Sequence, residues 1–113
     1  MRGISGPGVN KFHAKKCTFN GLTFDSKHER DRYIELTLME KAKAIQDLKT
    51  QVSFPLIGKS KYGREIKYIA DFTYYENGKL VVEDSKSPAT RTPIYRLKKR
   101  LLAERYGLII KET

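Results

Sequence analysis

The sequence predicts an α/β protein built on one mixed four-stranded sheet with helices packed against it. Two segments with helix start signals, at Ser26 and Thr92, alternate with runs of β-branched and aromatic residues. Asn77 and Gly78 stand between two such runs, which is the strongest short-range signal for a β-hairpin. A short apolar run follows the second helix, and a helical crossover implies a parallel strand there. The predicted element order is α-β-β-β-α-β.

Length and composition indicate one soluble domain. The chain has 113 residues, which suits a flexible arm over residues 1–10 and a single domain over residues 11–113. No apolar run approaches the roughly 20 residues that cross a membrane, and residues 1–16 lack the apolar core of a signal peptide. We therefore expect a cytoplasmic protein without a membrane partner. The single cysteine, Cys17, excludes an internal disulfide and a cysteine-rich zinc site.

The charge balance favours nucleic acid as the partner. The chain carries 23 Lys and Arg against 13 Asp and Glu, a formal net charge of +10. A small domain this basic has the electrostatic character of a nucleic-acid binder, although solubility alone or an anionic membrane surface would also suit it. No polybasic run stands beside an apolar anchor, which argues against a membrane. The expected phosphate contacts are Lys15, Lys16, Arg96, Lys98, Lys99 and Arg100.

The first helix begins at Ser26. The four residues from Ser26 to Glu29 match the S-x-x-E capping box, and we expect the helix to end near Ala44. Glu29 has two interpretations, and the sequence leaves both open. It is either the capping residue at the third helical position or a metal or water ligand. The second interpretation arises because the helix face that it shares with Tyr33 and Leu36 should turn inward.

The first strand is predicted over residues 48–56, where apolar and polar side chains alternate. Pro55 favours an edge position or a strand end, since proline cannot donate to a neighbouring strand. Gln51 lies on the polar side of this strand and is a second-rank site residue, with a plain strand glutamine as the alternative. A basic loop follows over residues 58–63.

The hairpin register brings two carboxylates together. A two-residue loop at Asn77 and Gly78 is typical of a type I′ turn between the strands. Counting back from that turn places Asp71 opposite Asp84 in a non-hydrogen-bonded pair, which is the closer kind. Lys86 lies two residues beyond Asp84 and therefore shares its face of the sheet.

Two facing aspartates repel each other, and a divalent cation would offset the repulsion. Mg²⁺ accepts carboxylate oxygens together with substrate phosphates, and it polarises a phosphodiester and activates water. Lys86 is placed to steady the nucleophile or the developing negative charge. The alternative is a surface hairpin in which the two aspartates and the lysine neutralise one another. Glu83 points to the opposite face and is a second-rank candidate, expected to meet solvent or pair with a helix.

The second helix is predicted from Thr92, its cap, through Pro93 at the first position to the stop at Gly107. Basic residues cover much of this helix. Its buried side is expected to carry Ile94, Leu97 and Leu101. A short buried strand over residues 108–110 completes the sheet.

The pattern formed by Asp71, the hairpin and Asp84-Ser85-Lys86 resembles the signature of the PD-(D/E)XK nuclease superfamily, and the element order is similar to its restriction-endonuclease-like core. The proline that usually precedes the first aspartate is Ala70 here, a position that shapes the backbone and provides no ligand. The resemblance is strongest to a small phage-encoded family, similar to transposon-end endonucleases, and covers the chain from about residue 11. It also rests on Ser26, Lys27, His28, Glu29, Gln51 and residues 68–72.

This resemblance implies a role for each site residue. Asp71 and Asp84, with the backbone carbonyl of Ser85, would bind the metal, which would be Mg²⁺ or Mn²⁺. Lys86 would be the catalytic lysine, and Glu29 the carboxylate contributed by the first helix.

The resemblance further implies a metal-dependent DNA endonuclease that hydrolyses phosphodiester bonds in phage DNA recombination or processing. Its substrate would be duplex or branched DNA, in the host cytoplasm if the protein is phage-encoded. The superfamily includes Holliday-junction resolvases, many of them dimers, so a homodimer is one expected state. Two alternatives remain open, namely a non-catalytic basic nucleic-acid-binding module and an RNA nuclease.

Overall fold

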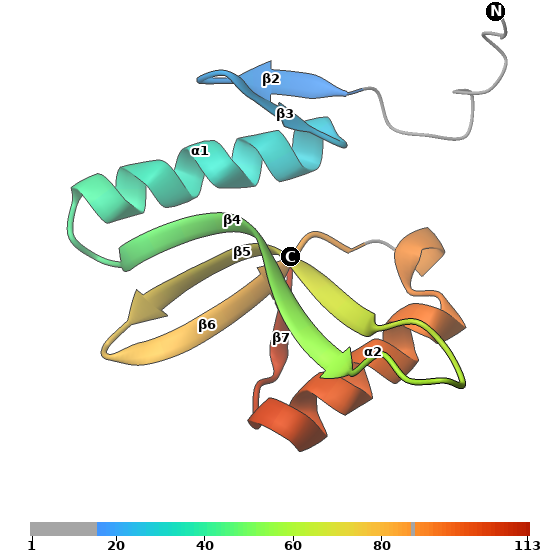
Figure 1. Ribbon diagram of the computed structural model, residues 1–113. Helices are drawn as coiled ribbons and strands as arrows, with labels where there is room; N and C mark the ends of the chain where they lie inside the picture. The colour runs from blue at the N-terminus through green and yellow to red at the C-terminus, as the bar shows by residue number, and fades with distance from the viewer. Residues whose placement is uncertain (1–15, 87) are drawn as a thin grey trace, which may run out of the picture. The chain divides into compact units, whose positions relative to one another are not determined.

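The computed structural model describes residues 16–86 and 88–113 (Figure 1). The predicted arm over residues 1–10 and the predicted phosphate contact at Lys15 lie outside these residues. The chain divides into two compact units, one ending at Leu38 and the other running from Met39 to Thr113. No helix among the described residues has the length and apolar character needed to span a membrane.

The first unit contains a small hairpin of strands β2 (Cys17–Phe19) and β3 (Leu22–Phe24). Asn20 and Gly21 turn it with φ angles of 52° and 78°, the left-handed conformation that a two-residue Asn-Gly turn between strands requires. The ring of Phe24 packs against Tyr33 of the following helix, with centroids 5.1 Å apart.

Helix α1 (Lys27–Lys41) begins at the predicted cap. The backbone N–H of Glu29 donates to Oγ of Ser26 over 3.1 Å, which satisfies one of the otherwise unpaired donors of the first turn. The helix ends at Lys41, earlier than the predicted end near Ala44. Lys43 adopts a left-handed φ of 64°, which an α-helix does not accommodate.

The second unit is built on a mixed sheet in the order β4-β5-β6-β7. The first two pairings are antiparallel and the third is parallel, which confirms the predicted α/β class, the four-stranded sheet and, from α1 onward, the predicted element order. The edge position of the strand that carries Pro55 is also confirmed. The strands are β4 (Gln46–Ile57), β5 (Ile66–Glu76), β6 (Lys79–Asp84) and β7 (Ile110–Glu112).

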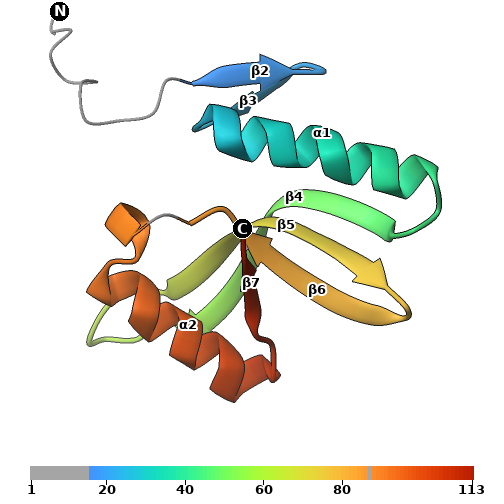
Figure 2. The ribbon, with the colours of Figure 1, turned by 180° about the vertical axis from the view of Figure 1, so that it is seen from behind.

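The β5–β6 hairpin has the predicted turn and register. Asn77 and Gly78 have φ angles of 54° and 77°, as a type I′ turn requires. From this turn the strands pair residue by residue as far as Phe72 opposite Glu83. Figures 1 and 2 show the turn pointing away from α2, so the opposite end of the hairpin lies toward that helix.

Helix α2 (Pro93–Tyr106) has both predicted ends. Oγ1 of Thr92 accepts from the backbone N–H of Tyr95 over 3.1 Å, and Gly107 closes the helix with a φ of 69°. At its C-terminal end the hydroxyl of Tyr106 donates to the carbonyl of Pro55 over 2.6 Å, which ties the helix to β4.

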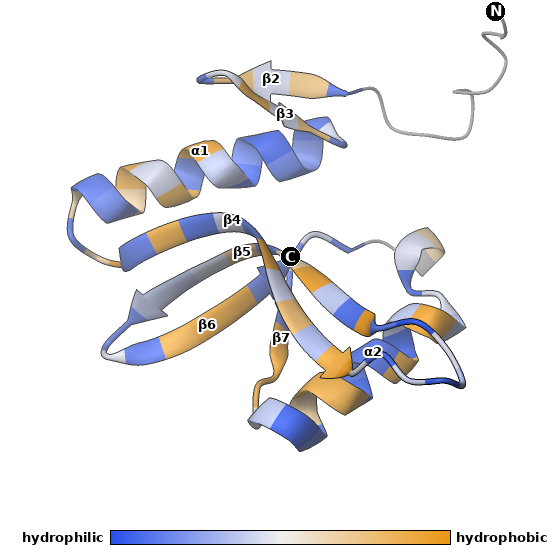
Figure 3. Ribbon diagram, viewed as in Figure 1, coloured by the Kyte–Doolittle hydropathy of each residue, from blue (hydrophilic) through white to orange (hydrophobic). Residues whose placement is uncertain are grey.

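The predicted buried face of α2 is wrong at Ile94 and Leu97, whereas Leu101 does pack against the core. Ile94 and Leu97 are 62% and 53% exposed, whereas Tyr95 and Leu102 are buried. The reason is that Tyr95 has both an apolar ring for the core and a hydroxyl that reaches Glu112, which fixes the rotation of the helix. Figure 3 shows apolar residues along β6 and on α2. The core contains Leu56, Tyr68, Ala70, Val82, Tyr95, Leu102 and Ile110.

The last strand lies later in the chain than predicted. Ile110 is buried and pairs with Val82, but Ile109 is 74% exposed and precedes the strand. The parallel pairing continues to Asp84 opposite Glu112. The strand extends to Glu112 because the side chain of that residue is held by α2, which is a tertiary contact that an apolar pattern does not reveal.

Candidate functional site

Asp71 and Asp84 stand at the end of the β5–β6 ladder, one step beyond the last pair, Phe72 and Glu83. Oδ2 of Asp71 accepts a 2.9 Å hydrogen bond from the backbone N–H of Ser85. The structure therefore brings the first aspartate to the residue that directly follows the second, while the predicted pair of Asp71 with Asp84 lies beyond the end of the ladder.

Asp84 is buried, and its carboxylate has two partners. Lys86 places its ammonium 3.3 Å from Oδ2 of Asp84, and the hydroxyl of Tyr68 donates to the same oxygen. Burying a carboxylate is costly unless it is paired or hydrogen-bonded, and these two contacts meet that need. Both contacts are made to Oδ2 of Asp84.

Tyr68 is a site residue that sequence reasoning missed. Tyr68 precedes Asp71 by three residues, so strict alternation along β5 assigns the two side chains to opposite faces of the sheet. However, residues 66–70 of β5 extend beyond the pairing with β6, and a phenol is long enough to reach Asp84 there. Burial, then the hydrogen bond to Asp84, then the nearby negative charges raise the pKa of Tyr68, so its hydroxyl remains a donor.

Lys86 is held by its backbone and by its side chain. Its N–H donates to the carbonyl of Thr113, and the N–H of Thr113 donates to the carbonyl of Asp84, each over 3.0 Å. The ammonium lies 4.3 Å from the centroid of the Tyr95 ring, within cation–π range. The lysine is thus fixed beside Asp84 by both the last strand and α2.

Glu112 connects α2 to the last strand. It accepts hydrogen bonds from the hydroxyl of Tyr95 over 2.6 Å and from Lys99 and Arg91 over 3.1 Å each. The Tyr95 bond, followed by the two cations, outweighs burial and lowers the pKa of Glu112 to about 2. Burial and the bond to Glu112 raise the pKa of Tyr95. No local pattern marks Glu112, since its partners come from another element.

Two buried hydroxyl groups have no hydrogen-bond partner among residues 16–86 and 88–113. They are Oγ of Ser85 and Oγ1 of Thr113. An unpaired buried polar group costs roughly 1–3 kcal/mol. Ser85 directly follows Asp84, so one of these unpaired oxygens lies within the predicted metal-binding segment.

The remaining predicted carboxylates have different surroundings. Glu29 is buried at the start of α1, in the first unit, and its assignment to the site stays a prediction. Glu83 is fully buried and accepts from the hydroxyl of Tyr74 over 2.6 Å, so the expectation that it meets solvent is wrong. The adjacent Phe72 and Tyr74 are buried too, which shows that this face of the hairpin does not meet water.

Gln51 of β4 lies opposite Asp71 of the neighbouring strand β5, because the β4–β5 pairs on either side of these two residues align them. Its φ of 53° departs from extended geometry, and the residue is exposed. The structure therefore brings Gln51 to the strand position opposite an aspartate, while its participation in the site stays a prediction.

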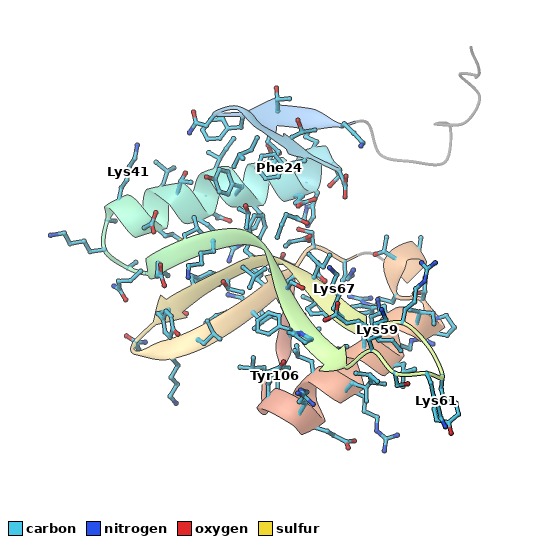
Figure 4. All side chains as sticks on the ribbon, viewed as in Figure 1. Phe24, Lys41, Lys59, Lys61, Lys67 and Tyr106 are labelled. Carbon is cyan, nitrogen blue, oxygen red and sulfur yellow. The ribbon has the colours of Figure 1, made fainter. Side chains whose placement is uncertain are left out.

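The residues predicted to contact phosphates differ in their exposure and in whether their positive charges are already paired with carboxylates of the protein. Lys16 and Arg96 are exposed, and Lys98 is half-buried. Lys99 is paired with Glu112, and Arg100 with Glu104 over 2.8 Å, so part of their charge is already balanced. Four more cations lie in the β4–β5 connection or directly after it and were not predicted as contacts. Figure 4 labels three of them; the four are Lys59, Lys61, Arg64 and Lys67.

The described part of the chain contains no group of three or more His, Cys, Asp or Glu side chains suited to holding a metal ion. A metal at Asp71 and Asp84 would therefore need backbone, water or phosphate oxygens as additional ligands. Mg²⁺ is commonly bound in this way, by one or two carboxylates together with substrate phosphates and waters. Two aspartate carboxylates are thus donors of the kind that Mg²⁺ accepts.

Comparison with known proteins identifies a family. The model of a family described as "Protein of unknown function (DUF1064)" matches residues 9–112. Because this match covers nearly the whole chain, the chain belongs to that family. No curated protein and no solved structure matches it.

Proposed function

We propose that this member of the DUF1064 family is a metal-dependent DNA endonuclease that hydrolyses phosphodiester bonds, acting in phage DNA recombination or processing. One observation carries the proposal. At the end of the hairpin, Asp71 is bonded to the backbone of Ser85 while Lys86 lies 3.3 Å from Asp84. Two carboxylates can bind Mg²⁺ together with substrate phosphates, and a bound Mg²⁺ polarises a phosphodiester and activates water.

The donor chemistry fits Mg²⁺ or Mn²⁺. Asp71, Asp84 and the backbone carbonyl of Ser85 would hold the ion, while a role for Glu29 stays a prediction from the sequence. All are hard oxygen donors, the type that Mg²⁺ prefers. When bound, the ion would supply charge neutralisation for the phosphate and a lowered pKa for water.

The protein's own side chains would orient the reaction. Lys86 would hold the attacking water or the developing phosphorane charge through its ammonium, which is a charge-assisted donor. Tyr68 would keep the Asp84 carboxylate in one orientation through its hydroxyl. Asp71 would be held in place by the N–H of Ser85.

The net charge of +10 would bring DNA to this site. Exposed cations contact phosphates without reading sequence, so they supply affinity and orientation. In the second unit Arg96 and the four cations in or directly after the β4–β5 connection are exposed. This distribution favours binding through the DNA backbone.

The test is a cleavage assay with labelled linear duplex, single-stranded, flap and four-way-junction DNA, with Mg²⁺ and with EDTA. Wild-type protein is expected to cut at least one of these DNAs only with Mg²⁺. Lys86→Met should bind DNA as wild type does but cut it on the order of 100-fold more slowly. DNA binding without any cleavage would favour the non-catalytic module. A protein that neither binds nor cuts any of these DNAs would contradict the proposal.

A further inference from the structure

The connection between β4 and β5 ends in a closed, ordered tip. The N–H of Ser60 donates to the carbonyl of Gly63 over 3.1 Å, and the N–H of Gly63 donates back over 3.2 Å. Oγ of Ser60 also accepts from the N–H of Tyr62 over 3.1 Å. These three bonds fix the backbone around Lys61 and Tyr62, so the tip presents both side chains from a defined position.

Tyr62 is presented to solvent. It is 87% exposed, more than any other large hydrophobic residue in the described part of the chain. The ring therefore contributes little to the core, although the backbone below it is held in place. Its described ring contact is with the Lys61 ammonium, 5.2 Å from the ring centroid. An aromatic face and a cation are thus offered together at the tip.

The residues around this tip are strongly basic. Residues 58–67, here called the β4–β5 arm, contain one acidic residue, Glu65. None of the arm's cations forms an ion pair with a described residue, in contrast to Lys99 and Arg100 of α2. The cations are Lys59, Lys61, Arg64 and Lys67, and three of them are labelled in Figure 4.

A fixed, exposed ring among unpaired cations suits one ligand class. Proteins that bind single-stranded DNA track phosphates with cations and stack bases on aromatic side chains. A continuous duplex also offers phosphates, but its base faces are covered by their neighbours. We infer that the β4–β5 arm binds unpaired nucleotides of DNA, with Tyr62 stacking on a base and the arm's cations contacting the adjacent phosphates.

This inference rests on the proposed function and narrows its substrate class. A nuclease with such an arm in the same unit as Asp71 and Asp84 would prefer DNA with unpaired or unstacked bases. Flaps, single strands and opened junctions belong to this class. A fully paired linear duplex does not.

The experiment measures equilibrium binding in EDTA, where no cleavage occurs. A fluorescent single-stranded oligonucleotide and a blunt duplex of the same length are titrated with wild type, Tyr62→Ala and Tyr62→Phe. Tyr62→Ala should weaken single-strand binding roughly 5- to 100-fold and duplex binding far less, because one stacked base is lost. Tyr62→Phe keeps the ring and should bind as wild type.

Tyr75→Ala is the matched control, since Tyr75 is also exposed but lies on the hairpin, and it should leave both affinities unchanged. Melting curves should show all variants folded. An equal effect of Tyr62→Ala on both DNAs, or none on either, would overturn the inference while leaving the proposed function intact. Wild type that binds neither DNA would contradict the proposed function as well.

Discussion

The ammonium of Lys86 lies 4.3 Å from the centroid of the Tyr95 ring, and the hydroxyl of that ring donates to Glu112. Tyr95 therefore joins the proposed catalytic lysine to the carboxylate of the last strand. A lysine side chain carries about 2 kcal/mol of rotamer entropy, so a free Lys86 would occupy many positions. The ring and Asp84 together restrict it, which makes Tyr95 a positioning residue for Lys86.

Replacing Tyr95 separates its two contacts. Tyr95→Phe keeps the ring and loses the hydroxyl, so cleavage should stay near the wild-type rate while the free energy of unfolding falls by about 1 kcal/mol. Tyr95→Leu also loses the cation–π contact and should slow cleavage roughly 2- to 30-fold. Single-turnover rates and urea unfolding measure the two effects. Equal rates for the Phe and Leu variants would show that the ring does not position Lys86.

Asp84→Asn should change how the protein responds to Mg²⁺. A ligand that binds only the folded state raises the melting temperature, so wild type should gain stability with Mg²⁺ and the variant should gain little. Without metal the variant should be less stable by about 1–3 kcal/mol, because Lys86 loses its buried partner. Glu104→Gln, which removes an exposed carboxylate of α2, should keep the full Mg²⁺ response. Equal shifts for wild type and Asp84→Asn would exclude Asp84 as a ligand.

Local chemistry accounts for what the sequence predicted well. The caps at Ser26 and Thr92 are set by bonds within one turn of helix, and the hairpin register by two left-handed residues at its turn. Once that register is known, the adjacency of Asp71 to the segment after Asp84 follows by counting. These features depend on interactions between residues that are close in the sequence, so they can be predicted from the sequence alone.

Features that depend on tertiary packing were missed. The rotation of α2 is set by Tyr95 reaching Glu112, and these residues are joined only after the crossover has placed β7 beside β6. The bond from Tyr68 to Asp84 depends on how far β5 extends beyond its partner strand. Neither of these two contacts can be derived from the periodicity of apolar residues in the sequence. That periodicity therefore selected a partly wrong face of α2 and placed the last strand too early.

Glu112 should make stability depend on pH in acid. Its pKa is lowered from 4.5 to about 2 in the folded protein, first by the bond from Tyr95 and then by Lys99 and Arg91. The folded state therefore favours the charged carboxylate. This stabilisation is fully present above about pH 4.5 and is lost as the pH falls toward 2.

Urea unfolding of wild type and Glu112→Gln across this range measures the effect. The difference in free energy of unfolding should be about 1–2 kcal/mol near neutral pH, allowing for solvent screening, and should shrink toward pH 2. A difference that stays constant with pH would mean that the charge of Glu112 does not stabilise the fold.

Glu29→Gln distinguishes the two interpretations of Glu29. Glutamine keeps the capping-box side chain but removes the charge, so the melting temperature should change little. If Glu29 serves the metal, cleavage should fall on the order of 100-fold. Glu35→Gln, an exposed position on the same helix, provides the control and should cut normally. Full activity of Glu29→Gln would leave Glu29 with its capping role only.

We propose that Asp71, Asp84 and Lys86 form a metal-dependent phosphodiesterase site. The most direct test compares wild type with Asp84→Asn in Mg²⁺-dependent cleavage of one labelled DNA, chosen as the best substrate of wild type. Both proteins are first shown to be folded and to bind that DNA equally in EDTA. We expect cleavage by wild type that requires Mg²⁺ and no cleavage above background by Asp84→Asn. Cleavage by the variant at the wild-type rate would contradict it.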